Sequence, residues 1–583
     1  MSAFKKFFVK KIDVFKASFI FAIVFELFFN HIVYMKYIVN SVVIKHVFLY
    51  ALVFHFVWSF VLALLFLLFS FNKYIFKTFV FIVLFLMASY SYYAYISFSS
   101  FKLNSVTLAL VFDTNMSETS EFLEMLPEPI WLFLLKRVLF PLFLVIFLPI
   151  KYKKLKIKNV LFKFKNFIIL HKKEIYAICF VILFAVVSKV IHRKRIIENM
   201  PLFDMSKVIF NTLKYRYNLG ISLKNDKSVY TFNFVDNNDN DDLIVVLFMG
   251  ESSRGDRWAL NGYSRNTNPL LSKRKNIINF KNAHSCRLSS SLSFACIITG
   301  HNDMENFAYW PKGETILSFF KKAGFKTAYI AAGATDFNDM LEKDMSNTTL
   351  KMTNETFLNK YDKSYDDKLI MLLDDVLNMS VHKKHKNFII MTSMGSHFNY
   401  KNRVPKQFQI FKTTDEKVKS VVINSKGGNC HVLNGKNLGD INDDYDATIL
   451  FTDYVLDSVI EKLKDKNAIF IYASDHGESF GERGQSCLHC YDEPEVWHIP
   501  MFLWVSDKFK RKNPDKWHNI QKFQQQELLN KRMVSHDNII HTLLDCSSVE
   551  SEFVDKRFSM CSQTKEIYEN KFEGCKRFKV GCM

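Results

Sequence analysis

Glycine is scarce in this chain. Of its 583 residues 18 are glycine, and none of them lies within residues 1–195. That first part is apolar and rich in phenylalanine and lysine, a composition typical of membrane-spanning segments. Beyond about residue 236 the chain carries the aspartate, asparagine, glycine and cysteine of a globular enzyme. The length allows several domains, and the composition predicts two unlike halves.

Two further features are absent. No internal repeat is evident, and no helix-turn-helix or RNA-binding signature accompanies the formal net charge of +20. The lysines crowd beside apolar spans, so we interpret the charge as membrane-flanking and expect no nucleic-acid partner.

The basic segment Met1–Lys16 has no small-residue cleavage site after it, so we expect an uncleaved membrane anchor. Apolar runs of spanning length predict five transmembrane helices, at Val14–Tyr34, Val47–Phe71, Ile75–Phe98, Ile130–Ile150 and Ile175–Ile191. These spans lack the paired charges and broken-helix signatures of transporters.

Lysines orient the predicted spans. Nine lysines lie between Lys151 and Lys173, whereas the loop after the third span has only Lys102. By the positive-inside rule the carboxyl-terminal half lies outside the cytoplasm, although Arg193-Lys194-Arg195 argues the other way. We therefore predict a membrane domain at 1–192, a bridging segment with one helix (Leu202–Tyr215) at 193–235, and a periplasmic catalytic domain at 236–583.

The second half alternates apolar runs with helical patterns. Leu243–Met249 lies between Asp241-Asp242 and a glycine, and predicts a strand buried on both faces. Further strands are predicted at Lys326–Ala332, Asn387–Thr392, Ala468–Tyr472 and Met501–Val505, with a helix at Tyr445–Leu463. This alternation predicts an α/β fold whose largely parallel sheet is covered by helices on both faces.

Ligand-type side chains follow two of these strands directly. Glu251 comes after the first, and Asp475-His476 comes after the strand at Ala468–Tyr472. Open α/β sheets hold ligands at the carboxyl edge, and carboxylate and imidazole groups are typical zinc ligands. The two strand ends together predict a metal site, which would polarise a phosphoryl oxygen and activate a hydroxyl.

A serine-rich turn offers candidate nucleophiles for such a site. Ser289, Ser290, Ser291 and Ser293 lie between Cys286 and Cys296, before an apolar stretch. A hydroxyl at a helix amino terminus would face a dipole that favours phosphate. The alternative is an ordinary serine-rich loop with a helix cap.

Nine of the ten cysteines fall beyond residue 280, in the half that the charge pattern places outside the cytoplasm. The pair Cys487-Leu-His-Cys490 allows zinc binding, redox chemistry or a disulfide. An oxidising periplasm favours disulfides.

Several short motif-like stretches lie around the predicted metal ligands and elsewhere in the second half of the chain. They are Gly250-Glu251-Ser-Ser-Arg, Asn261–Pro269, Gly395-Ser-His397, Tyr445-Asp446-Ala-Thr-Ile, Ser474–Ser479, His498-Ile-Pro500 and Ser535–Ile539. With five amino-terminal spans before them, they resemble the phosphoethanolamine transferases that decorate bacterial lipopolysaccharide, in the alkaline phosphatase/sulfatase superfamily.

The resemblance implies zinc on Glu251, Asp475, His476 and the nucleophile, which the cysteine register assigns to Ser290. It also implies His397 and His489 near the phosphate or a second metal, as catalytic and substrate-binding groups, and a bond between Cys286 and Cys296. In the loop 99–129, Asn115 and Thr119 match a headgroup-contacting segment, with Glu121 or Glu124 beside them. From spacing alone, an ordinary amphipathic loop helix is the alternative.

The chain departs from the family pattern at the nucleophile. Ser290 stands where the family has threonine, Arg287 and Leu288 replace Gly-Thr, and Ala295 replaces a proline. His489 is one residue further from His476 than is usual, and a cysteine-rich segment is missing around 332–339.

The resemblance implies transfer of phosphoethanolamine from phosphatidylethanolamine to lipid A or the inner core, through a phosphoethanolamine-serine, by a monomer of the bacterial inner membrane. The alternatives are a phosphoglycerol transferase, a sulfatase-like or phosphatase-like hydrolase, and an inactive membrane scaffold.

The lysine distribution predicts a topology. Alkaline phosphatase fused after residue 195 should be active, because it would lie in the periplasm, and the same reporter fused within Lys151–Lys173 should be inactive. The reverse pattern would overturn the compartment and the argument for disulfides.

Overall fold

The structure is a computed structural model. It describes residues 12–13, 74, 78, 150–151, 210, 230–235, 242–300, 315–331, 350–352, 365–380, 385–423, 433, 435–482, 487–489, 492–529 and 534–563. The five predicted spans and the helix at Leu202–Tyr215 lie almost wholly outside these residues. Within them no helix has the length and apolar character needed to cross a membrane. The predicted domain boundaries stay predictions.

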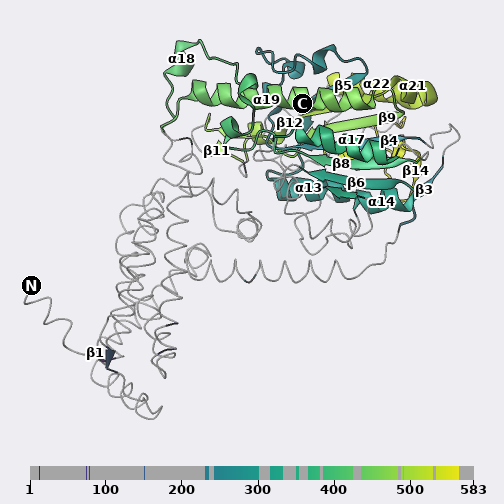
Figure 1. The fold of residues 1–583 in the computed structure, drawn as a ribbon, viewed down its shortest axis with the longest axis horizontal. Coiled ribbons are helices and arrows are strands. Elements are labelled where there is room, and N and C mark those ends of the chain that lie inside the picture. Colours follow the sequence, from purple (N-terminus) through teal and green to yellow (C-terminus); the bar gives the residue numbers. More distant parts are fainter. Residues whose placement is uncertain are drawn as a thin grey trace, which may run out of the picture. The chain divides into compact units, whose positions relative to one another are not determined.

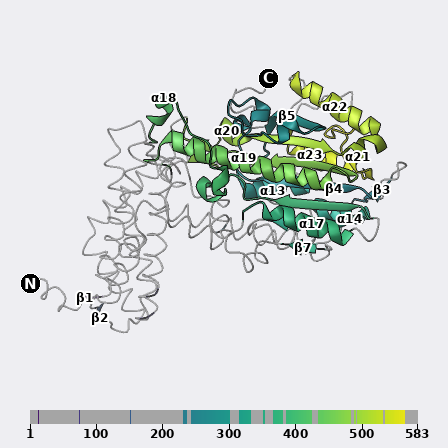
Figure 2. The same cartoon turned by 45° about the horizontal axis from the view of Figure 1, so that its top comes forward.

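An eight-stranded sheet organises the described part of residues 230–563 (Figures 1 and 2). Its order is β13 (Val534–Ser535), β5 (Ile277–His284), β12 (His498–Val505), β9 (Ala468–Ser474), β4 (Ile244–Gly250), β8 (Asn387–Thr392), β6 (Lys326–Ala331) and β7 (Leu350–Met352). Neighbours in this sheet are parallel except where β12 pairs with β5 and β9. The sheet is therefore mixed, although mostly parallel.

Helices cover both faces of the sheet. One core cluster joins Val245, Leu247 and Met249 of β4 to α13 (Ser290–Thr299), α14 (Ile316–Lys322), α22 (Pro514–Leu528) and α23 (Asp537–Cys546). Alternate residues of a strand face opposite sides, so Val246 and Phe248, also fully buried, face the other layer. There α17 (Lys368–Ser380) packs beside the long α19 (Leu438–Leu463) (Figure 2).

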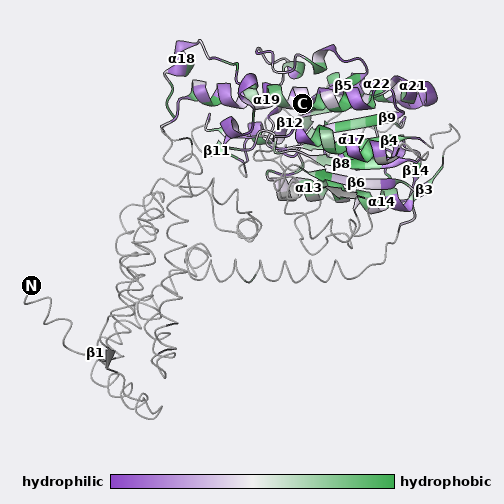
Figure 3. Cartoon of the chain, in the orientation of Figure 1, coloured by the Kyte–Doolittle hydropathy of each residue, from purple (hydrophilic) through white to green (hydrophobic). Residues whose placement is uncertain are grey.

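The strands that the sequence predicted are found in the structure. The sequence could predict them because each is a nearly continuous apolar run. β4, β8 and β9 are buried at every position. Figure 3 shows hydrophobic strands at the centre of the sheet and a hydrophilic α18 (Glu416–Lys419) at its periphery. A strand that is buried on both faces does not alternate apolar and polar residues as a half-exposed strand does. The length of the apolar run is therefore the feature that predicts such a strand.

Three parts of this fold differ from the prediction. The strand predicted at Met501–Val505 begins at His498 and runs antiparallel, with an irregularity between Ile499 and Met501 at Pro500. The sequence did not indicate β5, because polar residues interrupt its apolar positions. α19 begins at Leu438 rather than Tyr445, because Asn437 caps its amides while its first turns are polar.

The smaller elements complete the fold. The sheets of two strands are β1 (Ile12–Asp13) with β2 (Ile150–Lys151), β3 (Asn233–Phe234) with β14 (Val549–Glu550), and β10 (Ser479–Phe480) with β11 (Cys487–Leu488). Short helices are α20 (Pro494–Trp497) and α21 (Asp507–Lys512). The predicted bond between Cys286 and Cys296 is present, a second joins Cys546 to Cys561, and Cys487 is also disulfide-bonded.

The bond between Cys546 and Cys561 ties the segment after β14 to the end of α23. It closes a loop of 15 residues, which in the chain-entropy model contributes about 3 kcal/mol. We expect replacement of both cysteines by serine to lower the free energy of unfolding by about that amount, measured by urea denaturation of the full chain in detergent. The wild type should approach the variant when a reductant is added, and equal stability of the two oxidised proteins would contradict the prediction.

Candidate metal centre

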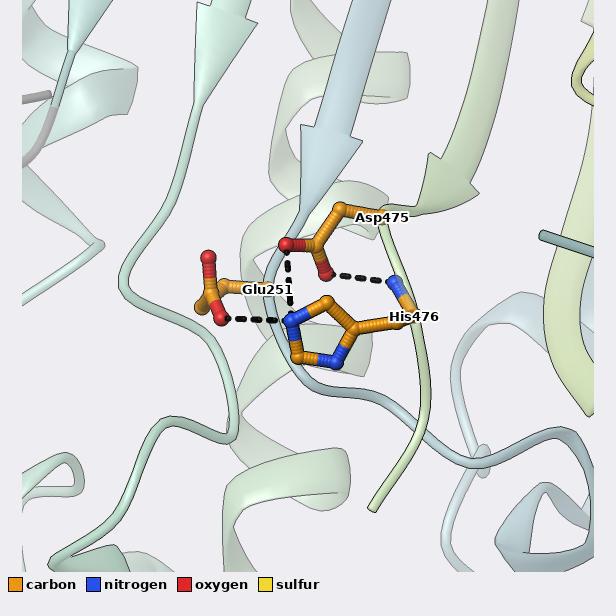
Figure 4. Close-up of side chains that lie close together, drawn as sticks. All are labelled: Glu251, Asp475 and His476. Atoms are coloured by element: carbon orange, nitrogen blue, oxygen red, sulfur yellow. Dashed lines mark hydrogen bonds and ion pairs between the residues drawn. The ribbon is translucent and has the colours of Figure 1, made fainter. Parts of the chain in front are cut away.

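The metal-ligand candidates come together because their strands end together. β4 and β9 are parallel neighbours, and their register pairs Gly250 with Ser474. Glu251 and Asp475, the next residue on each strand, therefore leave the same edge of the sheet. Figure 4 shows these two carboxylates and His476 facing one another. One ligand atom from each residue lies within 4.8 Å of the others.

His476 presents an unprotonated ring nitrogen to the carboxylates. Its Nδ1 is 2.8 Å from the carbonyl oxygen of Gly477, which can only accept, so Nδ1 carries the proton. Nε2 then has its lone pair directed at the site, 3.4 Å from Asp475 Oδ2 and 3.7 Å from Glu251 Oε1. Burial lowers the pKa of this imidazole to about 4, against the opposing charge of Asp475, so the ring is neutral as a metal ligand must be.

Asp475 has one oxygen satisfied and one that is not. Oδ1 accepts the backbone N–H of Ser252 at 2.9 Å and that of His476 at 2.7 Å. Oδ2 is buried and has no hydrogen-bond partner among the described residues. A buried carboxylate oxygen without a donor is costly. Since Oδ2 faces the other two ligand groups, a cation is the partner that fits it.

Glu251 also lacks a positive partner for its charge among the described residues. Burial, and then the charge of Asp475, raise the pKa of the Glu251 carboxyl well above its usual range. Two carboxylates that share a site cannot both ionise cheaply without a positive partner. A divalent ion at this point would reverse that balance, so the residues present fit a metal.

Ser290 completes the group. It is the first residue of α13, and its Oγ lies 3.1 Å from Glu251 Oε1 and 3.1 Å from His476 Nε2. The other serines differ: Ser289 Oγ is buried without a partner among the described residues, and Ser293 Oγ donates to the carbonyl of Arg287. The side chain of Ser291 lies outside the described part of the chain. Of the described serines in this serine-rich turn, Ser290 is therefore the one whose hydroxyl reaches the metal-ligand group.

Two further histidines lie beside this group. The rings of His476 and His489 are 4.4 Å apart between centroids, and those of His489 and His397 are 6.3 Å apart. His489 Nδ1 is 3.3 Å from Glu478 Oε1. Burial and then the charge of Arg403 lower the pKa of His397 to about 3, so its ring is neutral. Its Nδ1 donates to the carbonyl of Phe398 at 2.7 Å, which leaves Nε2 as an acceptor.

The residues that hold the site in place lie in the quoted motifs, but sequence reasoning assigned them no role. Ser252 has a φ of 56°, a left-handed conformation that is rare outside glycine. Its amide holds Asp475, its hydroxyl donates to Glu251 at 2.8 Å, and its carbonyl accepts the Tyr445 hydroxyl at 2.7 Å. Gly395, at a φ of 46°, lets its own loop approach Glu251, because a Cβ there would lie 2.6 Å from the Glu251 carbonyl oxygen.

His536 also holds the site in place, and the motif Ser535–Ile539 was the sequence signal that contained it. Its side chain is buried and bonds both to the serine-rich turn and to β9. Nε2 donates to the carbonyl of Ser474 at 2.8 Å, and Nδ1 accepts the amide of Cys286 at 3.2 Å. It thus connects the residue before Asp475 to the cysteine that opens the serine-rich turn.

The remaining predicted site residues, Asn115, Thr119 and Glu121 with the alternative Glu124, lie outside the described residues. The described group can hold one metal ion beside a hydroxyl at a helix amino terminus. That arrangement suits attack on a phosphate or sulfate ester, because the ion and the helix dipole both favour the negative charge that develops.

Comparison with known proteins identifies relatives. Residues 244–549 match the family described as Sulfatase. The Kdo(2)-lipid A phosphoethanolamine 7''-transferase of Salmonella typhimurium is 29% identical over 287 residues, 48% of this chain and 47% of that protein. Phosphoethanolamine transferase EptA of Helicobacter pylori is 31% identical over 315 residues, 52% of this chain and 53% of that protein. The chain thus spans about half the length of the curated relatives it matches.

A solved structure shares the fold. It is the integral membrane lipooligosaccharide phosphoethanolamine transferase A (EptA) from Neisseria meningitidis, with a TM-score of 0.69 and 21% identity. The match covers 93% of this chain and 98% of that one.

The geometry predicts how metal binding depends on charge. Asp475→Asn keeps the shape of the side chain but removes the charge that offsets a cation, so we expect divalent-metal affinity to fall by about 100-fold or more. Metal content of the purified full chain by mass spectrometry measures this. Asp440→Asn, at an exposed position of α19, is the matched control and should bind metal like the wild type. Equal metal content in both variants would contradict the assignment.

Proposed function

The chain belongs to the sulfatase family, and on that premise we propose that it transfers phosphoethanolamine from phosphatidylethanolamine to lipopolysaccharide, on lipid A or the inner core. The observation that supports this most directly is the position of Ser290 Oγ, 3.1 Å from both Glu251 and His476. The names of the relatives favour phosphoethanolamine over other groups of the superfamily.

Zinc is the proposed metal. Glu251, Asp475, His476 and Ser290 would hold it, and a carboxylate–imidazole–hydroxyl set suits that ion. When bound, zinc would lower the pKa of the serine hydroxyl and neutralise charge on the phosphoryl oxygens.

The first proposed step uses the hydroxyl of Ser290. Its oxygen attacks phosphorus of phosphatidylethanolamine, and its proton passes to His397 or His489, the proposed proton carriers. The bond to the diacylglycerol oxygen breaks, and that oxygen takes up a proton. A phosphoethanolamine ester of Ser290 remains, at the amino terminus of α13, where the helix dipole favours its charge.

In the second step the phosphoethanolamine group leaves Ser290 for a hydroxyl or phosphate oxygen of the acceptor. An acceptor oxygen of lipopolysaccharide attacks the ester, and Ser290 recovers its proton. His397 and His489 are the proposed proton carriers, because neutral imidazole can take a proton and return it. The neutral state of His397 follows from its burial, while Glu478 next to His489 can stabilise that ring when it is protonated.

The remaining elements of the proposal come from the sequence. Five transmembrane helices would anchor a monomer in the bacterial inner membrane with the catalytic domain in the periplasm. Asn115, Thr119 and Glu121 would contact the donor headgroup. A phosphoglycerol transferase or a hydrolase would share the metal site, so the donor that is consumed is the decisive property.

The covalent adduct tests the proposal. Incubation of the full chain with phosphatidylethanolamine should add phosphoethanolamine to Ser290, located by peptide mass spectrometry. Ser290→Ala should lower transfer by several orders of magnitude without unfolding the chain, because it removes the nucleophile. Ser290→Thr should remain active, since it keeps a hydroxyl.

Ser289→Ala is the matched control, one residue away, and should cost far less than Ser290→Ala. An adduct on another serine, or full transfer by Ser290→Ala, would contradict the role of Ser290. An adduct formed from phosphatidylglycerol in place of phosphatidylethanolamine would contradict the proposed donor.

A further inference from the structure

A polar cavity opens at the end of the sheet from which the metal-ligand candidates emerge, and none of those candidates lines it. Its volume is about 790 Å³, and its lining includes Asp256, Tyr263, Ser264, Lys281, Asn282 and His498. We infer that it binds the acceptor's saccharide, as a sugar ring that bears an anionic group. This inference rests on the proposed transfer, and it adds where the acceptor is held.

The walls of the cavity continue into the two segments that carry the chemistry. On one side, Asp256 follows Glu251 in the loop after β4. On the other, His498 pairs in register with His284, two residues before Cys286, and the amide of Ser285 bonds to the carbonyl of Trp497 at 2.9 Å. A ligand in the cavity therefore lies against the same sheet edge as Ser290.

His498 holds the two walls together. Its Nε2 donates to the carbonyl of Lys281 at 2.7 Å, on the β5 side. On the loop side, Gly255 lies so close that a Cβ there would be 2.7 Å from the imidazole. Asn282 is fixed through its backbone, whose N–H donates to the buried Glu527 at 2.9 Å. The cavity is consequently formed before any ligand arrives, as binding sites usually are.

The lining selects the chemical class of ligand. The exposed side chains of Ser264, Lys281 and Asn282 make no hydrogen bond to other described residues, so their donors and acceptors are available. A hydroxyl, an amide and an ammonium group suit the many hydroxyls of a sugar and one negative substituent. An acyl chain would need a mostly apolar lining, whereas Leu528 is the one aliphatic side chain among the residues that line this cavity.

The charge of the cavity favours an anionic sugar. Its one carboxylate, Asp256, is already paired with Arg254, which lies 2.8 Å away. The ammonium of Lys281 makes no ion pair within 4 Å among the described residues, although its charge acts on the buried Glu527 carboxyl, and it is exposed to a ligand. Two parts of lipopolysaccharide offer this chemistry, the carboxylated Kdo sugars and the phosphorylated glucosamines of lipid A.

Binding can be measured apart from reaction. In the full chain with Ser290→Ala, we expect Lys281→Gln and Asn282→Ala each to weaken binding of Kdo2–lipid A by about tenfold. Neither change alters the backbone contacts of these residues with His498 and Glu527. Lys275→Gln, an exposed lysine of the same segment outside the cavity, is the matched control and should bind within twofold of the parent.

Steady-state transfer gives a second readout. With Ser290 intact, the two cavity variants should raise the acceptor KM about tenfold and leave kcat at saturating acceptor nearly as it was. A fall in kcat with unchanged KM would indicate a structural effect and overturn the inference, as would unchanged binding in both variants. If the wild type transfers no phosphoethanolamine but the variants still lose binding, the proposed function is overturned. The assignment of the cavity as a saccharide-binding site then stands.

The same variants separate the two sources of the anion. Loss of affinity for Kdo2–lipid A alone, with lipid A lacking Kdo unaffected, identifies the sugar carboxylate as the partner of Lys281. Equal loss for both acceptors identifies a lipid A phosphate. Either result supports a saccharide site.

Discussion

The site depends on the parallel pairing of β4 and β9, which ends both strands at the same level, Gly250 beside Ser474. The next residue of each strand must then emerge beside its counterpart, and in both strands that residue is a carboxylate. β8 and β5 run in the same direction, so His397 and the serine-rich turn leave from that edge too. A slip of one residue in the pairing would point every side chain of a strand to the opposite face. The apolar runs that fix the register therefore also fix the chemistry.

This arrangement has an electrostatic cost that local contacts offset only in part. Burial and Asp475 together oppose ionisation of Glu251. Backbone amides of Ser252 and His476 stabilise one oxygen of Asp475, and the other oxygen is left without a described donor. The backbone of Ser252 is strained to supply its amide, and the Tyr445 hydroxyl on its carbonyl holds it there. The unmet negative charge of Glu251 and Asp475 is what a bound cation would offset.

The sequence could indicate the ligands because each directly follows a buried apolar run. It could not indicate the groups that hold them, because those contacts join distant segments. Ser252 and Tyr445 are separated by 193 residues, and His536 and Cys286 by 250. Nor could it show β5, whose burial comes from pairing with β12 and β13 and not from its own pattern. The direction of β12 was likewise unreadable, since an apolar run has the same composition either way. The membrane half and its Asn115 segment rest on sequence alone.

This chain has serine at position 290, where the resemblance to the phosphoethanolamine transferases leads one to expect threonine. A β-branched threonine is stiff about χ1, whereas serine is free to rotate. Here that freedom is limited by two acceptors 3.1 Å from Oγ, Glu251 Oε1 and His476 Nε2, either of which can take the one hydroxyl proton, and by the position of Ser290 as the first residue of α13. The turn before it is held by the bond between Cys286 and Cys296, by Ser293 on the Arg287 carbonyl, and by His536 on the Cys286 amide. Because the backbone and the hydroxyl are both held by other contacts, the methyl group of threonine is not needed to aim the hydroxyl that we propose as nucleophile.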